Sequence, residues 1–122
     1  MTIQYAIDYI NRTKRNTCDR KDLISWLSQL EHRVKTQIVD AYEGAEHVTF
    51  TGYDEHTEMS TVLLVPAPYD EMYLRYLEAQ IDYVNAEEER YNNAIDLFNR
   101  LWQEYRRYYI RTHMPKRQNI QY

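Results

Sequence analysis

The sequence has few of the residues that interrupt or cross-link a chain. Of its 122 residues, only 2 are glycine, 3 are proline and 1 is cysteine. Cys18 cannot form an internal disulfide, which indicates a reducing compartment. The scarcity of glycine and proline argues against a loop-rich or disordered chain. The length and composition therefore predict one folded domain.

Long hydrophobic runs are also missing. No apolar stretch approaches the roughly 20 residues that a membrane-spanning helix needs. Residues 1–15 contain neither the apolar core nor the small-residue cleavage site of a signal peptide. We therefore expect a protein that is soluble and intracellular when made, with no membrane partner.

Catalytic and metal-binding motifs are absent as well. The histidines form no H-x-x-x-H or E-x-x-H spacing, and there is no Gly-rich phosphate loop or nucleophile elbow. Glu78 and Asp82 lie one helical turn apart, but the simpler interpretation is a solvated acidic face. Cys18 lies in a basic stretch that could lower the pKa of its thiol, although no catalytic partner can be assigned. The sequence predicts no enzyme, no cofactor and no metal site.

Tyrosine, in contrast, is abundant, with 13 residues. Its apolar ring and polar tip suit both a small helical core and a binding surface, and both interpretations stay open. Within a formal net charge of -4, residues 12–21 and 100–117 are basic and residues 69–89 are acidic. Such segregation indicates either complementary faces between copies or solvated faces of one bundle. The acidic balance argues against general nucleic-acid binding.

Apolar residues at helical spacing predict four helices. The expected ranges are 2–14, 20–43, 69–86 and about 89–112, with Gly44 as the stop of the second helix. The third and fourth helices are either joined by a tight link at residues 86–89 or continuous as one bent helix. Trp26 and Trp102 lie on apolar stripes, so they are expected to pack the second helix against the fourth.

Residues 46–65 change period and predict a small β-hairpin between the second and third helices. Pro66 cannot donate to a strand ladder and is expected to end the second strand, while Pro68 suits the first turn of a helix. The two prolines would form a rigid structural corner. The predicted fold class is mainly α: a helical bundle of about four helices with a β-hairpin insertion. Residues 1–112 form the single domain, and residues 113–122 form an extended C-terminal tail.

Two stretches carry a resemblance to a known family: LLVPAPYDEMYLRYLEAQIDYVNAEEERYNNAIDLFNRLWQEY at residues 63–105 and RTHMPK at residues 111–116. They resemble the head–tail connector (adaptor) proteins of long-tailed phages and prophages of Gram-positive bacteria. The resemblance implies a homo-oligomeric ring, typically dodecameric, between the portal protein and the stopper or tail-completion protein. DNA would pass through the lumen without sequence-specific binding. The implied location is the virion neck, and the host cytoplasm during assembly.

The resemblance also implies that the C-terminal segment docks on the portal. The candidate portal contacts are Arg111, His113, Met114, Lys116 and Arg117. Mixed tyrosine and arginine is typical of interface hot spots. The candidate subunit-interface residues are Tyr69, Tyr73, Tyr105, Arg106, Tyr108 and Tyr109. The alternatives are another neck protein, either a stopper or a tail terminator, and a small helical regulatory protein that binds one partner.

Overall fold

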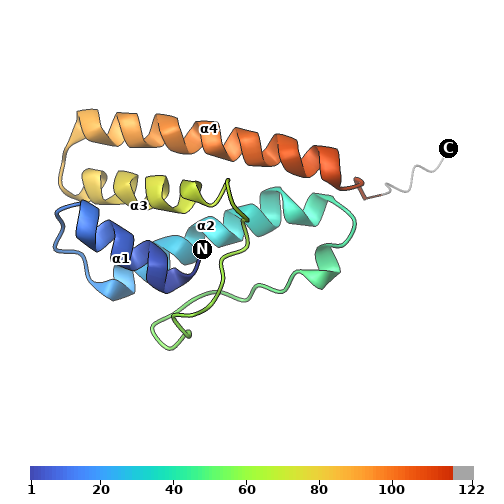
Figure 1. The fold of residues 1–122 in the computed structure, drawn as a ribbon, viewed down its shortest axis with the longest axis horizontal. Coiled ribbons are helices and arrows are strands. Elements are labelled where there is room, and N and C mark those ends of the chain that lie inside the picture. Colours follow the sequence, from blue (N-terminus) through green and yellow to red (C-terminus); the bar gives the residue numbers. More distant parts are fainter. Residues whose placement is uncertain (117–122) are drawn as a thin grey trace.

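The protein folds into four α-helices joined by one long irregular segment (Figure 1). The structure is a computed structural model, and it describes residues 1–116. The helices are α1 (Ile3–Thr13), α2 (Arg20–Gln37), α3 (Glu71–Val84) and α4 (Glu88–Thr112). Two 3₁₀ turns follow α2, namely η1 (Val39–Ala41) and η2 (Ala45–His47). The predicted helical bundle is confirmed.

Helix α3 is the centre of the bundle. It packs against α1, α2 and α4, and Figure 1 shows α4 on one side of it with α1 and α2 on the other. Its buried residues lie almost all round the helix: Met72, Tyr73, Leu74, Tyr76, Leu77, Ala79, Ile81 and Asp82. A helix that is apolar on most of its circumference is stable only in an interior.

Helix α4 instead buries a single stripe. Its buried side chains recur every three or four residues: Ala94, Phe98, Trp102, Tyr105 and Tyr109. Arg33 of α2 contacts this stripe. Its guanidinium lies 5.0 Å from the centre of the Trp102 ring and 5.7 Å from that of the Phe98 ring. Trp102 is therefore a core residue, as predicted, whereas Trp26 is only partly buried against the core.

Helix α2 ends earlier than predicted. The α-helix stops at Gln37, and the expected continuation to residue 43 is replaced by η1 and η2. The next two residues, Ile38 and Val39, are β-branched and both buried. A tighter 3₁₀ turn at a helix end lets both side chains reach the core. Gly44 follows with a φ of 90°, a conformation that glycine adopts without steric cost.

The predicted β-hairpin at residues 46–65 is wrong. In the described chain these residues form no hairpin ladder, and the only bridges are Thr2 with Val62 and Tyr42 with Pro115. The N–H groups of Leu64 and Val65 donate to side chains of α2 and α3, and the Leu63 N–H donates to the Met1 carbonyl (2.9 Å). The alternation of Leu63 and Val65, both buried, with exposed Val62 reflects an extended segment lying on the bundle.

A tight turn separates α3 from α4, which excludes one bent helix. The Glu87 N–H donates to the Asp82 carbonyl (2.9 Å), and the Ala86 N–H donates to the Tyr83 carbonyl (3.2 Å). This pair of bonds is the Schellman motif, which requires a left-handed residue after the helix cap. That residue is Ala86, with a φ of 57°. An alanine in this region carries a steric penalty that glycine would avoid.

Replacing Ala86 with glycine is therefore expected to stabilise the protein. The gain in the free energy of unfolding should be about 1 kcal/mol, since relief of the left-handed penalty exceeds the entropy cost of glycine. Urea denaturation of the variant and the parent protein measures it. The matched control is Ala94→Gly inside α4, which should lose about 1 kcal/mol or more. Equal losses at both positions would contradict the assignment.

Candidate functional site

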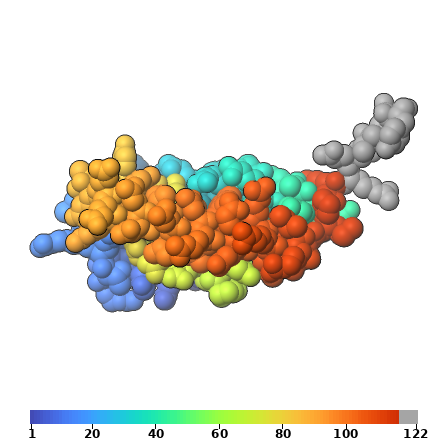
Figure 2. Space-filling model, turned by 90° about the horizontal axis from the view of Figure 1, so that it is seen from above, coloured from blue at the N-terminus to red at the C-terminus, as the bar shows by residue number. Residues whose placement is uncertain are grey.

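Helix α4 presents a basic face to solvent. Arg100, Arg107 and Arg111 are exposed and lie at spacings of seven and four residues, which places them on one side of the helix. Figure 2 views the molecule from this side, with α4 across the middle of the surface. Leu97 and Ile110 flank the stripe and are also exposed. Exposed arginine beside apolar side chains is a composition suited to binding another macromolecule.

An aromatic cluster joins the C-terminal half of α4 to the start of α3. The Tyr69 ring lies 5.7 Å from that of Tyr105 and 5.1 Å from that of Tyr108. Tyr109 lies 5.8 Å from Tyr105 and 5.4 Å from Tyr42. Such aromatic pairs add stability beyond the area they bury, so the cluster fixes this end of the bundle.

The cluster corrects the predicted subunit interface. Tyr73, Tyr105 and Tyr109 are buried within the subunit and cannot present their rings to a neighbour. Tyr69 and Tyr108 are half-buried, and Arg106 is exposed. The apolar stripe that suggested an interface is the inner face of α4, so its tyrosines serve the core first.

The C-terminal segment is extended, but it lies against the bundle. The Glu43 N–H donates to the Met114 carbonyl (2.7 Å), and the Lys116 N–H donates to the Ala41 carbonyl (3.1 Å). The His113 ring stacks on Tyr109 with 3.7 Å between ring centres. Residues 113–116 therefore form a short strap on the turn after α2.

The strap arranges the candidate portal contacts at one end of the molecule. Arg111, Met114 and Lys116 are exposed, whereas His113 is half-buried beneath Tyr109. Arg117 lies outside the described residues. Arg111, in the last turn of α4, thus lies at the same end of the bundle as the strap (Figure 1).

The two prolines lie where the extended segment enters α3. The Pro66 carbonyl accepts from the N–H groups of Tyr69 (3.0 Å) and Asp70 (3.1 Å). The Ala67–Pro68 peptide bond is cis, and α3 begins at Glu71. Residues 66–68 are exposed, so this corner lies on the surface.

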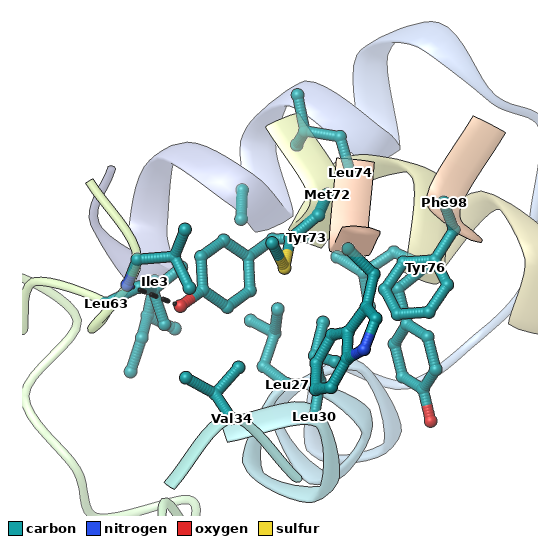
Figure 3. Close-up of a cluster of buried hydrophobic side chains, with 14 of the residues drawn as sticks. Ile3, Leu27, Leu30, Val34, Leu63, Met72, Tyr73, Leu74, Tyr76 and Phe98 are labelled. Atoms are coloured by element: carbon teal, nitrogen blue, oxygen red, sulfur yellow. Dashed lines mark hydrogen bonds between the residues drawn. The ribbon is translucent and has the colours of Figure 1, made fainter. Parts of the chain in front are cut away.

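A buried carboxylate, that of Glu31, ties three segments together. Glu31 is fully buried and accepts from the hydroxyl of Tyr73, the hydroxyl of Tyr53 (2.8 Å) and the Leu64 N–H (2.9 Å). The Tyr73 hydroxyl in turn accepts from the Val65 N–H (2.9 Å). Figure 3 shows the Tyr73 ring crossing the core from α3 toward Ile3 and Leu63.

This network shifts the acidity of its members. Burial raises the pKa of Glu31, although the three hydrogen bonds to its carboxylate lower it in part. Burial and the neighbouring carboxylate raise the pKa of Tyr73 and of Tyr53. A buried group with a shifted pKa is a candidate for catalysis. Here both carboxylate oxygens already accept hydrogen bonds from the chain, so the arrangement is structural.

Sequence reasoning missed Glu31, although a signal was present. Glu31 follows Leu27 by four residues and precedes Val34 by three, so it lies on the apolar stripe of α2. A carboxylate at such a position is buried only when it has partners. The partners could not be identified from sequence, because they come from residues 53–73.

The acidic face predicted at Glu78 and Asp82 is also corrected. Asp82 is buried, and its Oδ1 lies 2.5 Å from the Lys14 Nζ. That approach lies outside hydrogen-bond geometry, so the Oδ1 atom has an ion-pair partner but no hydrogen bond. Glu78 forms an ion pair with Arg75 (2.6 Å). Because both carboxylates have cationic partners, they do not form a free cation site.

Cys18 differs from expectation too. Burial raises the pKa of its thiol, and the nearby carboxylates of Asp22 and Asp19 raise it further. The surrounding basic residues of the sequence do not lower it. The thiol is therefore less reactive than an unperturbed cysteine.

Within residues 1–116, no group of three or more histidine, cysteine or acidic side chains is placed to hold a metal ion. None of the described helices is long and apolar enough to cross a membrane. Comparison with family models, with curated proteins and with solved structures finds no match. We therefore infer the function from the surfaces of the chain itself.

The Glu31 network predicts a pH dependence of stability. Because the folded state raises the pKa of Glu31 above its unfolded value of about 4.3, the folded state holds a proton that the unfolded state has lost. Its contribution is therefore greatest at low pH and falls as the pH rises through the folded pKa. The stability advantage of the parent protein over Glu31→Gln should shrink as the pH rises above about 4.3, the pKa of an unfolded glutamate. Urea denaturation across this range measures it.

The control for that series is Glu104→Gln, at an exposed position of α4. Its stability difference from the parent should stay nearly constant over the same range. A Glu31→Gln difference that grows as the pH rises would show that the pKa of Glu31 is lowered in the folded protein.

Removing the Tyr73 hydroxyl is expected to cost more than removing an exposed one. Tyr73→Phe leaves a Glu31 oxygen and the Val65 N–H without a partner, at a cost of about 1–3 kcal/mol. Tyr83→Phe, at an exposed ring, should change the free energy of unfolding by less than about 0.5 kcal/mol. Equal effects in thermal or urea denaturation would refute a structural role for the network.

Proposed function

We propose that the protein is a head–tail connector of a tailed phage: an adaptor subunit that forms a ring between the portal and the tail. The observation that carries the proposal is the strap. An extended segment with exposed Met114 and Lys116 lies at the end of α4, beside exposed Arg111. Two backbone hydrogen bonds hold it, so a partner can compete for it at a small energetic cost.

The fold supports the adaptor position over neighbouring neck positions. Within residues 1–116, the chain forms a helical bundle, and its β-structure consists of two isolated bridges. Stoppers and tail terminators, the alternatives implied by the resemblance, are usually β-rich. The long α3–α4 pair, with an extended segment at one end, fits a helical ring subunit better.

The charge of the chain suits a subunit beside moving DNA. The formal net charge is -4, so most of the surface does not attract phosphates. A lumen lined with basic residues would bind the backbone and slow its passage. The basic face of α4 is therefore expected to be turned away from the channel.

The direct test mixes the protein with the portal protein encoded by the same genome. Negative-stain electron microscopy should show an added ring of density at the narrow end of the portal. Bare portals at high concentrations of the small protein would overturn the adaptor proposal. They would favour a tail-side position or a regulatory protein that binds one partner.

Deleting residues 113–122 is expected to weaken portal binding while the bundle stays folded. The deletion removes the strap and its two backbone hydrogen bonds, but the buried stripe of α4 remains. The loss in stability should be about 1–2 kcal/mol. Cosedimentation with portal rings measures binding, and circular dichroism checks the fold.

A second variant separates charge from backbone contact. Lys116→Gln with Arg117→Gln keeps residues 113–115 and removes two positive charges. Binding reduced only by the deletion would assign the contact to the rest of residues 113–122 and not to these two charges. Portal affinity unchanged in both variants would exclude the C-terminal segment as the docking element.

A further inference from the structure

We infer that the basic face of α4 docks against the acidic loop tip of a second copy of the chain. The basic face is defined by Arg100, Arg107 and Arg111. The loop tip is defined by Asp54, Glu55 and Glu58, which are all exposed. The inference deepens the proposed ring function, and the closed ring rests on that function.

Within residues 1–116, the arginines of the basic face form no ion pair. Of the helices, α4 packs chiefly against α3, and the arginine stripe points away from that contact. No acidic group in residues 1–116 lies within ion-pair distance of Arg100 or Arg107. Leu97 and Ile110 are 42% and 50% exposed, so the stripe also has apolar area to bury.

The loop tip lies far from the basic face of its own subunit (Figure 1). Figure 1 shows the loop that carries residues 54–58 on the side of the molecule opposite α4. Asp54 accepts from the His56 N–H (2.8 Å), which keeps the turn closed, while Glu55 and Glu58 remain exposed. Arg20 and Lys21 lie near Glu55, but Asp19 lies in the same shallow hollow.

The opposite positions of the two patches restrict the symmetry of the contact. Two complementary patches on opposite sides of one subunit cannot both be satisfied in a two-fold dimer that pairs like with like. They form a head-to-tail contact, which repeats and closes into a ring or grows as a filament. Electrostatic complementarity of this kind fixes the register between copies and excludes the face-to-face pairing of two basic stripes.

A second copy suits the basic face better than DNA does. A nucleic-acid site would be expected to use a continuous basic surface, whereas Asp96 and Glu104 are exposed beside the arginine stripe. Such mixed charge is matched by a protein surface that carries both signs, as the region of Glu55 with Arg20 and Lys21 does.

The experiment uses two half-interface variants of the full chain. Arg100→Gln with Arg107→Gln removes the basic face, and Glu55→Gln with Glu58→Gln removes the acidic tip; Asp54 is kept because it closes the turn. The matched control, Arg12→Gln with Arg15→Gln, removes two exposed charges from the α1 end. All changes are at exposed positions, and circular dichroism verifies the fold.

Sedimentation velocity at about 0.01 M salt, where the Debye length is ~30 Å, measures self-association. We expect the parent and the control to self-associate. The self-association constant of each half-interface variant should be lower by about tenfold or more. Mixing the two half-interface variants should restore a single 1:1 dimer and nothing larger. In that mixture each dimer has one intact contact, between the acidic tip of one variant and the basic face of the other. The two patches left over are the substituted ones, so they do not bind a third copy.

Three outcomes would overturn the inference: a parent that stays monomeric at all concentrations, half-interface variants equal to the control, or a mixture that assembles like the parent. Binding of duplex DNA that Arg100→Gln with Arg107→Gln abolishes would assign the face to nucleic acid instead.

Portal binding is measured in parallel. Self-association that follows these variants without portal binding would sink only the proposed function, whereas portal rings unaffected by the variants would sink only this contact.

Discussion

The buried carboxylate of Glu31 is the constraint on which the rest of the structure depends. It lies on α2, yet its hydrogen-bond donors are Tyr53 and Leu64 on the long segment and Tyr73 on α3. A carboxyl group taken out of water is tolerated only when its hydrogen-bond partners are all in place. Three parts of the chain must therefore be positioned together, and an irregular segment of more than twenty residues is held in one conformation without a sheet of its own.

That network explains why the helices could be predicted and the hairpin could not. Helical stripes such as Phe98, Trp102 and Tyr105 depend on local spacing, which the sequence states directly. The segment at 46–65 has the alternation of strands, but its N–H groups at Leu64 and Val65 donate to side chains of α2 and α3. Hydrogen-bond partners that are distant in the sequence replace the strand ladder, and no local sequence pattern predicts them.

The candidate site likewise has one part that the sequence predicts and another part that depends on tertiary packing. The exposure of Arg106, Arg111 and Lys116 follows from their charge, and the sequence already named them as candidate contact residues. The burial of Tyr73 and Tyr105 depends on tertiary packing, because tyrosine is equally at home in a core and at an interface. The strap was expected as an extended tail, but its contact with residues 41–43 required the 3₁₀ turns that end α2 early.

Because α3 has neighbours on every side, the bundle has no need of a further element to complete its core. Among the exposed charges, the arginine stripe of α4 and the acidic tip of the long segment lie on opposite sides of the subunit (Figure 1). The Glu31 network holds the base of that segment through Tyr53, next to the tip at residues 54–58. A rigid base keeps the tip at a defined position relative to α4, and a head-to-tail contact can close into a ring only if that geometry is fixed.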